Sequence, residues 1–155
     1  MKPLINVLTK KAHNAASAFY RLVLIVGPHG CGKSALLQSF TNEEHQSVVN
    51  VGVELSKRLM EEPARNRPAR VASLFRELID TTASTVLLDN IEVLFEPSLK
   101  MNPLKLLQQL SRQTTVVATW PGRIIGNTIT YAVEGESEFR SYPLSDIAYI
   151  QMEES

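Results

Sequence analysis

Short, largely apolar segments recur along the chain and are separated by polar stretches. Residues 22–26 (LVLIV), 85–89 (TVLLD) and 114–120 (TTVVATW) each contain few polar positions. Runs of this length that end in turn residues are typical of strands buried on both faces of a parallel sheet. Residues 48–53 (VVNVGV) predict another strand, which Gly52 weakens because glycine has no side chain to pack.

The stretches between these strands carry helical periodicity. Residues 33–40 predict a helix after the first strand, and apolar side chains recur at spacings of three and four over residues 71–80. An Asn-Pro pair at residues 102–103 predicts a capped helix that runs to residue 112. Residues 61–70 are polar and contain prolines and arginines, so they predict an exposed connection.

The pattern weakens after Pro121 and Gly122, which are expected to end the third apolar strand. Residues 128–133 (TITYAV) predict one more strand, and residues 141–151 (SYPLSDIAYIQ) predict a strand that leads into a short helix. Strands that alternate with helices imply right-handed crossovers and a parallel sheet covered by helices on both sides. The fold class is therefore predicted to be a three-layer α/β fold.

Length and charge set limits on the protein as a whole. The 155 residues predict a single domain, with an N-terminal extension at 1–20, a core at 21–122 and a C-terminal strand and helix segment at 123–155. Lys and Arg number 16, as do Asp and Glu, so composition predicts no global attraction to nucleic acid or membranes. The single cysteine, Cys31, and the lack of an apolar run near the roughly 20 residues of a membrane span predict a cytoplasmic protein.

A glycine-rich motif follows the first strand, within the stretch VLIVGPHGCGKSALL. Gly27, Gly32, Lys33 and Ser34 satisfy G-x-x-x-x-G-K-[ST], a pattern in which successive backbone N–H groups point at phosphates. Lys33 is predicted to reach the β- and γ-phosphates of ATP and Ser34 to ligate Mg²⁺, as in a P-loop NTPase fold. The predicted nucleotide-binding residues are Gly27, Pro28, His29, Gly30, Cys31, Gly32, Lys33, Ser34 and Ala35.

Two neighbouring strand ends supply the other candidates for this site. Asp89 ends the strand at residues 85–89, where its carboxylate could hold Mg²⁺ through water, and Thr119 would reach the same sheet edge. Many P-loop ATPases place a glutamate directly after the aspartate, but Asn90 stands there, so Glu92 is the candidate for orienting the attacking water. Structural alternatives stay open: a turn residue for Asp89, a backbone-bonded hydroxyl for Thr119 and a solvated carboxylate for Glu92.

Basic residues offer candidates that spacing alone does not rank. Arg112, Arg123 and Arg140 are each candidates for an arginine finger, although surface arginine is the more frequent case and a finger can also come from another subunit. A second group could contact a DNA backbone or could simply form a solvated connection. This group consists of Lys57, Arg58, Arg65, Arg67 and Arg70.

Segments outside the phosphate loop carry a resemblance to a known family. They are the Asp-Asn-Ile-Glu sequence at residues 89–92 with the following VLFEPSL, then NPLKLLQQLSR, and then VVATWPG at residues 116–122. From about residue 20 to about residue 145 the chain resembles the small P-loop protein family BrxF of bacteriophage-exclusion (BREX) defence systems, particularly the type-three systems. The Asp-Asn-Ile-Glu and Trp-Pro-Gly sequences are the specific parts, because the phosphate loop occurs in a very large superfamily.

This resemblance implies an ATPase in a multi-protein bacterial system that distinguishes host DNA by methylation and blocks phage replication. It implies a homo-oligomer or other defence-system proteins as partners, with any DNA contact indirect or weak. More distantly the chain resembles the AAA+ core, in which residues 139–146 (FRSYPLSD) would be the last core strand leading toward a helical lid. Because the sequence stops at Ser155, the resemblance implies a core without the lid. Either neighbouring subunits then complete the nucleotide site, or ATP turnover is slow.

Three uses of the nucleotide remain open on this reasoning. The favoured one is an oligomerising ATPase whose nucleotide state controls assembly, because Glu92 offers a water-positioning carboxylate. The second is a non-hydrolysing switch or scaffold, which Asn90 in the usual glutamate position favours. The third is a small-molecule kinase, which would need an acceptor pocket and a closing segment such as residues 61–70.

Overall fold

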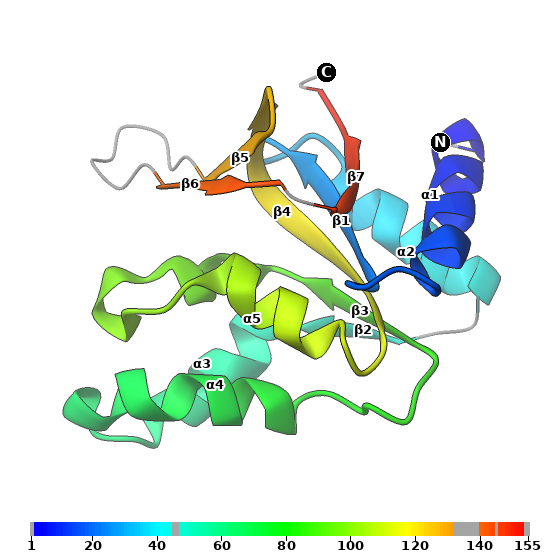
Figure 1. Ribbon diagram of the computed structural model, residues 1–155. Coiled ribbons are helices and arrows are strands. Elements are labelled where there is room, and N and C mark those ends of the chain that lie inside the picture. Colours follow the sequence, from blue (N-terminus) through cyan, green and yellow to red (C-terminus); the bar gives the residue numbers. More distant parts are fainter. Residues whose placement is uncertain (1, 45–46, 132–139, 145, 154–155) are drawn as a thin grey trace.

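The computed structural model describes residues 2–44, 47–131, 140–144 and 146–153. Within these residues the chain forms a seven-stranded sheet whose parallel core has the order β2-β3-β4-β1-β7 (Figure 1). The predicted parallel α/β fold is therefore confirmed, as are its three apolar strands. The core strands are β1 (Leu22–Gly27), β2 (Val48–Asn50), β3 (Thr85–Asp89), β4 (Thr115–Ile125) and β7 (Ala148–Gln151).

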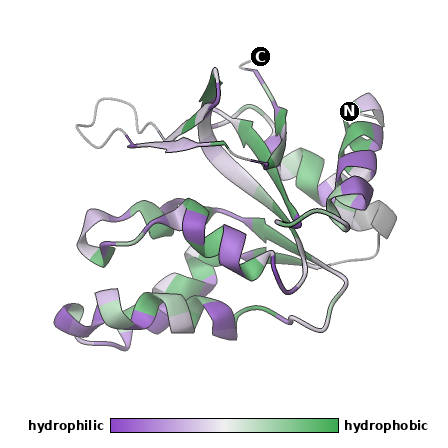
Figure 2. Cartoon of the chain, viewed as in Figure 1, coloured by the Kyte–Doolittle hydropathy of each residue, from purple (hydrophilic) through white to green (hydrophobic). Residues whose placement is uncertain are grey.

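Helices cover both faces of this sheet, because alternate side chains of a buried strand point to opposite sides. In β1, which is hydrophobic along its length in Figure 2, Val23 and Ile25 pack on one face and Leu22, Leu24 and Val26 pack on the other. Apolar residues of α1 and α2 pack on the face that carries Val23 and Ile25. Apolar residues of α3, α4 and α5 pack on the opposite face. These helices are α1 (Lys2–Ala15), α2 (Lys33–Glu44), α3 (Val51–Met60), α4 (Arg67–Glu77) and α5 (Pro103–Leu110).

The strand predicted at residues 48–53 is only half correct. Strand β2 ends at Asn50, whose side-chain oxygen accepts a hydrogen bond from the Val53 N–H at 3.1 Å. This contact satisfies a free N–H group in the first turn of a helix, so Asn50 caps α3 and Gly52 lies inside a helix that the sequence reasoning missed. The apolar run predicted a strand because it gives no signal that separates a strand from a helix start.

The connection predicted at residues 61–70 is shorter than expected. A short 3₁₀ segment, η1 (Ala64–Asn66), leads into α4, which begins at Arg67 with Pro68 in its first turn. Proline is tolerated there because first-turn N–H groups have no partner within the helix. The predicted cap of α5 is confirmed, since the Asn102 side chain accepts from the Lys105 N–H at 3.0 Å.

The prediction that Pro121 and Gly122 end a strand is wrong. Strand β4 continues through both residues to Ile125 and there pairs antiparallel with β5 (Thr128–Tyr131), which pairs with β6 (Arg140–Pro143). Figure 1 shows this antiparallel extension projecting beyond the parallel core. The strand expected at 128–133 is confirmed as far as Tyr131, and residues 132–133 lie outside the described residues.

The C-terminal part also differs from the prediction. Residues 141–151 contain the end of β6 and the whole of β7, so the expected short helix there is wrong. The last core strand is β7, which pairs parallel with β1, and not the segment at residues 139–146. Between β3 and α5 the chain forms two 3₁₀ segments, η2 (Ile91–Phe95) and η3 (Pro97–Leu99).

Candidate nucleotide site

The phosphate loop joins the end of β1 to the start of α2 at the carboxyl edge of the parallel sheet. Gly30 and Gly32 have φ angles of +80° and +102°, which residues with side chains rarely adopt. They turn the chain so that α2 begins at Lys33 with its free N–H groups at the loop, a favourable place for an anion. His29 and Ser34 are exposed, so the predicted phosphate-binding surface is open to solvent.

Lys33 is a nearly buried cation in this loop. Only 8% of its surface is exposed, and its Nζ donates to the Pro28 carbonyl oxygen at 2.8 Å and lies 3.9 Å from Cys31 Sγ. An ammonium has three donors, so these contacts leave capacity for a phosphate oxygen. Among the described residues no carboxylate pairs with Nζ. A nearly buried ammonium without an anionic partner fits the phosphates of ATP, which would supply that anion.

Asp89 and Thr119 lie together at the ends of neighbouring strands. The Thr119 hydroxyl donates to Asp89 Oδ1 at 2.7 Å, and the Asn90 N–H donates to the same oxygen at 2.9 Å. Thr119 is 1% exposed, so this pair is built into the sheet and is not a surface contact. The sequence left open that the Thr119 hydroxyl bonds to the backbone. In the structure it bonds to the Asp89 carboxylate instead.

The same carboxylate fits a role at Mg²⁺. Its Oδ1 is held by two donors, and its Oδ2 makes no hydrogen bond that involves another described residue. Ser34, in the first turn of α2, is exposed and offers a hydroxyl oxygen. Within the described part of the chain no three His, Cys, Asp or Glu side chains gather, so phosphate and water oxygens would complete the coordination, as Mg²⁺ commonly requires.

Glu92 makes no contact with Asp89 or Thr119 among the hydrogen bonds and ion pairs of the described residues. Asn90 has φ 55° and ψ 56°, the left-handed conformation, and turns the chain from β3 into η2. Ile91, Leu94 and Phe95 of η2 are buried, while Glu92 is exposed and makes no ion pair or hydrogen bond with the described residues. The structure therefore leaves the solvated-carboxylate alternative for Glu92 open.

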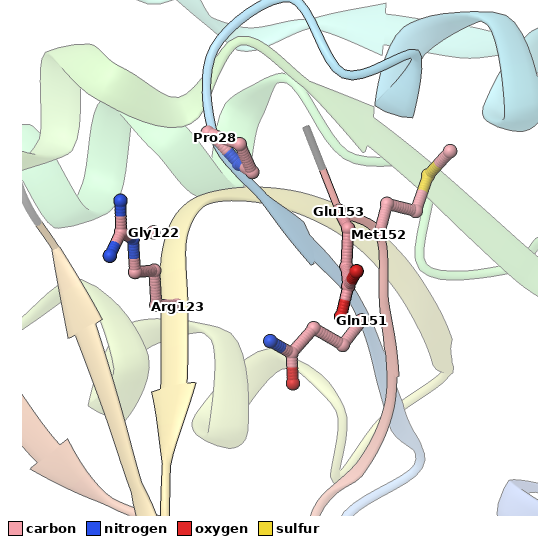
Figure 3. A pocket seen from close by; sticks show the side chains of 6 residues that line it. All are labelled: Pro28, Gly122, Arg123, Gln151, Met152 and Glu153. Carbon is pink, nitrogen blue, oxygen red and sulfur yellow. The ribbon is translucent and has the colours of Figure 1, made fainter. Parts of the chain in front are cut away.

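The three candidate arginines have different surroundings. Arg112 donates to the Phe19 carbonyl oxygen at 2.6 Å and lies over the Phe19 ring at 3.6 Å. Arg140 donates to the Met101 carbonyl oxygen at 3.2 Å. Arg123 lines a pocket of about 230 Å³ that also contains Pro28 of the phosphate loop (Figure 3). Of the three, Arg123 is the one that shares a pocket with a residue of the phosphate loop.

No local pattern marks the residues at the end of β7 and just after it that border the loop. The Met152 N–H donates to the Val26 carbonyl oxygen at 2.7 Å, and a side chain placed at Gly27 would come within 2.8 Å of the Met152 carbonyl oxygen. Gln151, Met152 and Glu153 also line the pocket beside Pro28. They were missed because the segment was expected to form a helix and not a strand beside β1.

The basic group at residues 57–70 is largely engaged within the chain. Arg58 pairs with Glu54 at 3.4 Å, and Arg70 pairs with Glu62 at 2.9 Å. The hydrogen bond to Glu62 raises the pKa of the Arg70 guanidinium above its usual value. Arg67 donates to the backbone carbonyls of Leu59 and Glu62. The Glu54 and Glu62 carboxylates thus offset part of the positive charge of this surface, while Lys57 and Arg65 are exposed. Contact with a DNA backbone stays a prediction.

Comparison with known proteins identifies the family. Residues 23–126 match the family described as "ATPase family associated with various cellular activities (AAA)". The chain belongs to the AAA ATPase family. This assignment confirms the predicted AAA+-type core, supports the predicted ATPase activity, and makes ATP the expected nucleotide. No curated protein matches the chain.

The solved structures that are similar to this chain include two that illustrate the likeness. The structure of C. elegans PCH-2 has 15% identity and a TM-score of 0.45, with 97% of this chain and 42% of that chain covered. The structure of Drosophila ORC bound to DNA has 16% identity and a TM-score of 0.49, with 98% and 42% covered. The AAA chain described here thus spans about two fifths of the length of each. None of its described helices is long and apolar enough to cross a membrane.

Proposed function

We propose that this AAA protein binds ATP with Mg²⁺ and hydrolyses it at the carboxyl edge of its parallel sheet. The observation that carries this proposal is the 2.7 Å hydrogen bond from Thr119 to Asp89, which joins two strand ends at the edge that also carries the phosphate loop. A threonine and an aspartate at this edge are expected where Mg²⁺ and a terminal phosphate are bound. An isolated phosphate loop would not need this pair.

Each side chain has a role that its position supports. Lys33 binds the β- and γ-phosphate oxygens. The backbone N–H groups of residues 29–35 surround the phosphates. Ser34 and Asp89 would hold Mg²⁺, directly or through water, and would place its charge beside the phosphates. Thr119 fixes the Asp89 carboxylate and can accept a hydrogen bond from the attacking water.

Hydrolysis at this site converts ATP and water to ADP and phosphate. The water oxygen forms a bond to the γ-phosphorus while the bond from that phosphorus to the bridging oxygen breaks, and its electron pair stays on ADP. The exposed Glu92 carboxylate, free of other partners among the described residues, orients this water and accepts its proton. For this role the Glu92 side chain must turn toward the γ-phosphate.

We further place the protein in the cytoplasm, as part of a bacteriophage-exclusion defence system. The support is the resemblance of the Asp-Asn-Ile-Glu and Trp-Pro-Gly segments to the BrxF family. In this system the nucleotide state controls assembly, with further copies of the chain or other defence proteins as partners. Any DNA contact is indirect or weak, because Arg58, Arg67 and Arg70 of the basic group bond to neighbouring groups of the chain.

A non-hydrolysing switch is the second candidate function. Two observations favour it: Asn90 occupies the place where many P-loop ATPases have a glutamate, and Glu92 has no contact that holds it at the site. The small-molecule kinase alternative has less support, because Arg67 and Arg70 of its proposed closing segment are bound to neighbouring groups.

Steady-state ATP turnover over a range of protein concentrations separates these functions. For the ATPase we expect turnover per chain that rises with concentration, since further subunits complete the site, and a loss of about 100-fold in Glu92→Gln. The matched control is Glu96→Gln, another exposed carboxylate on the same connection. Tight ATP binding without turnover at any concentration would instead establish the switch.

A further inference from the structure

The pocket beside the phosphate loop lies between the ends of β4 and β7. Six residues line it: Pro28, Gly122, Arg123, Gln151, Met152 and Glu153. Figure 3 shows Arg123 on the β4 side, with its side chain running toward the end where Pro28 lies, and Gln151 and Glu153 on the β7 side. Among the described residues that line this pocket, Arg123 is the one with a cationic side chain.

This pocket adjoins the place where the terminal phosphates of ATP are expected. Pro28 forms part of its wall, and the carbonyl oxygen of the same residue accepts the hydrogen bond from Lys33 Nζ at 2.8 Å. Pro28 therefore links the two cations: it is hydrogen-bonded to Lys33, and it lines the same pocket as Arg123. An anion held by the lysine ammonium would lie on the phosphate-loop side of this pocket.

The backbone of β4 directs Arg123 to this side of the sheet. Side chains at every second position of a strand share a face, so Thr119, Pro121 and Arg123 lie on one face of β4. Arg123 pairs with Thr130 of β5, and the Thr130 hydroxyl donates to the Arg123 carbonyl oxygen at 3.4 Å. Arg123 is thus held on a paired strand and not on a free loop.

The Trp-Pro-Gly sequence makes this placement possible. A Cβ atom at Gly122 would overlap the Thr130 carbonyl oxygen, so only glycine allows β5 to approach this closely. The Trp120 Nε1–H donates to the same carbonyl oxygen at 3.0 Å. These two contacts attach the antiparallel extension to β4 and carry the strand past the end of β1. They give a physical reason for a motif that the phosphate site does not itself require.

Arg123 is also free to bind a ligand. Its side chain is exposed and forms no hydrogen bond or ion pair with any of the described residues, unlike Arg112 and Arg140. A guanidinium presents five N–H donors in a planar arrangement that matches phosphate oxygens. Glu153, on the opposite wall, is not paired with it at ion-pair distance.

We propose that Arg123 binds the terminal phosphate of ATP from within the same chain, and that the Trp120-Pro121-Gly122 sequence serves to position it. This inference rests on the proposed ATP site and adds a residue to it. The guanidinium stabilises the negative charge on the equatorial γ-phosphate oxygens as the bond to the bridging oxygen breaks. An arginine supplied by a neighbouring subunit is then not required for this contact.

Nucleotide titrations of the full chain test the contact. Arg123→Ala is expected to weaken ATP binding about 10- to 100-fold, the range for a charge-assisted hydrogen bond, and ADP binding less than about 3-fold, because ADP lacks the terminal phosphate. Arg123→Lys should restore part of the ATP affinity. The control is Arg76→Ala, which removes an exposed arginine on α4 that bonds only to the Gln109 side chain and should change neither affinity.

Two results would overturn the proposal: equal losses for ATP and ADP, or unchanged ATP affinity. If Arg123→Ala fails to unfold cooperatively, the Arg123→Lys titration takes its place, because lysine retains the charge and loses the planar donor set. A partial loss of ATP affinity, with less change for ADP, is then the expected result, and unchanged ATP affinity overturns the proposal. Mixing Arg123→Ala chains with Lys33→Ala chains tests the origin of the arginine. Recovered turnover would show that it acts between subunits, and no recovery is expected for an arginine in the same chain. Absence of ATP binding by the unaltered chain would instead overturn the proposed function itself.

Discussion

The two halves of β4 differ in how they are held. Residues 115–118 lie between β1 and β3, paired in parallel on both edges and buried on both faces. Residues 122–125 pair only with β5, antiparallel, and Arg123 and Ile125 there are exposed. The first half belongs to the sheet core, and the second extends from it through contacts with one partner strand.

This difference shows how one strand contributes in two ways to a single site. The buried half ends at Thr119, which is 1% exposed and donates a hydrogen bond to Asp89 Oδ1 at 2.7 Å. The extended half brings Arg123 to the pocket beside Pro28, in a position that depends on the approach of Thr130 to Gly122. The proposed metal-binding carboxylate is thus held by the core, and the proposed phosphate-binding arginine by the extension.

Among the substitutions in β4, Gly122→Ala should have the largest effect on stability, because it acts on the extended half and leaves the buried half intact. The added Cβ overlaps the Thr130 carbonyl oxygen, so β5 must move, and we expect unfolding free energy to fall by about 2–4 kcal/mol. ATP affinity should fall as in Arg123→Ala, since the same arginine is displaced. The measurement is denaturant unfolding combined with ATP titration.

The matched control for this prediction is Gly126→Asn, in the turn between β4 and β5. A Cβ at Gly126 meets no atom within 4 Å, and asparagine tolerates its φ of +60° better than most residues. Its cost should stay below about 1 kcal/mol. Equal destabilisation by both variants would mean that the turn, and not the close approach at Gly122, holds the extension.

Thr119→Val tests the buried half with a smaller effect. Valine fills nearly the same volume but removes the donor to Asp89 Oδ1, which then keeps only the Asn90 N–H. We expect ATP turnover to fall about 10-fold, because the carboxylate is less well oriented, with a stability change below about 1.5 kcal/mol. Thr119→Ser, which retains the hydroxyl, should keep most of the turnover. Full activity in the valine variant would leave the hydroxyl with no part in the reaction.

The sequence predicted the buried strands and the positions of their ends, for a physical reason. Continuous apolar runs such as residues 22–26 and 85–89 have few alternatives to a buried strand, and strand ends in a parallel sheet meet at one edge. The placement of Asp89 and Thr119 at one edge followed from that rule. The phosphate loop motif predicted the turn because positive φ angles at Gly30 and Gly32 require glycine.

The extension could not be predicted in the same way. Proline and glycine at residues 121–122 usually end a strand, and no local pattern shows that the Thr130 carbonyl will occupy the space above Gly122. The start of α3 was missed for a similar reason, since Asn50 acts as a cap only once the strand β2 has ended there. Both features depend on contacts between segments and not on periodicity.

The most direct test of the central claim is ATP binding by Lys33→Ala, measured beside its thermal unfolding. We expect a loss of at least about 100-fold in ATP affinity, because the nearly buried ammonium is the main cation proposed to bind the phosphates. Cooperative unfolding should remain, since the fold depends on the apolar strands. ATP affinity equal to that of the unaltered chain, in a folded variant, would contradict the assignment of this sheet edge as the nucleotide site.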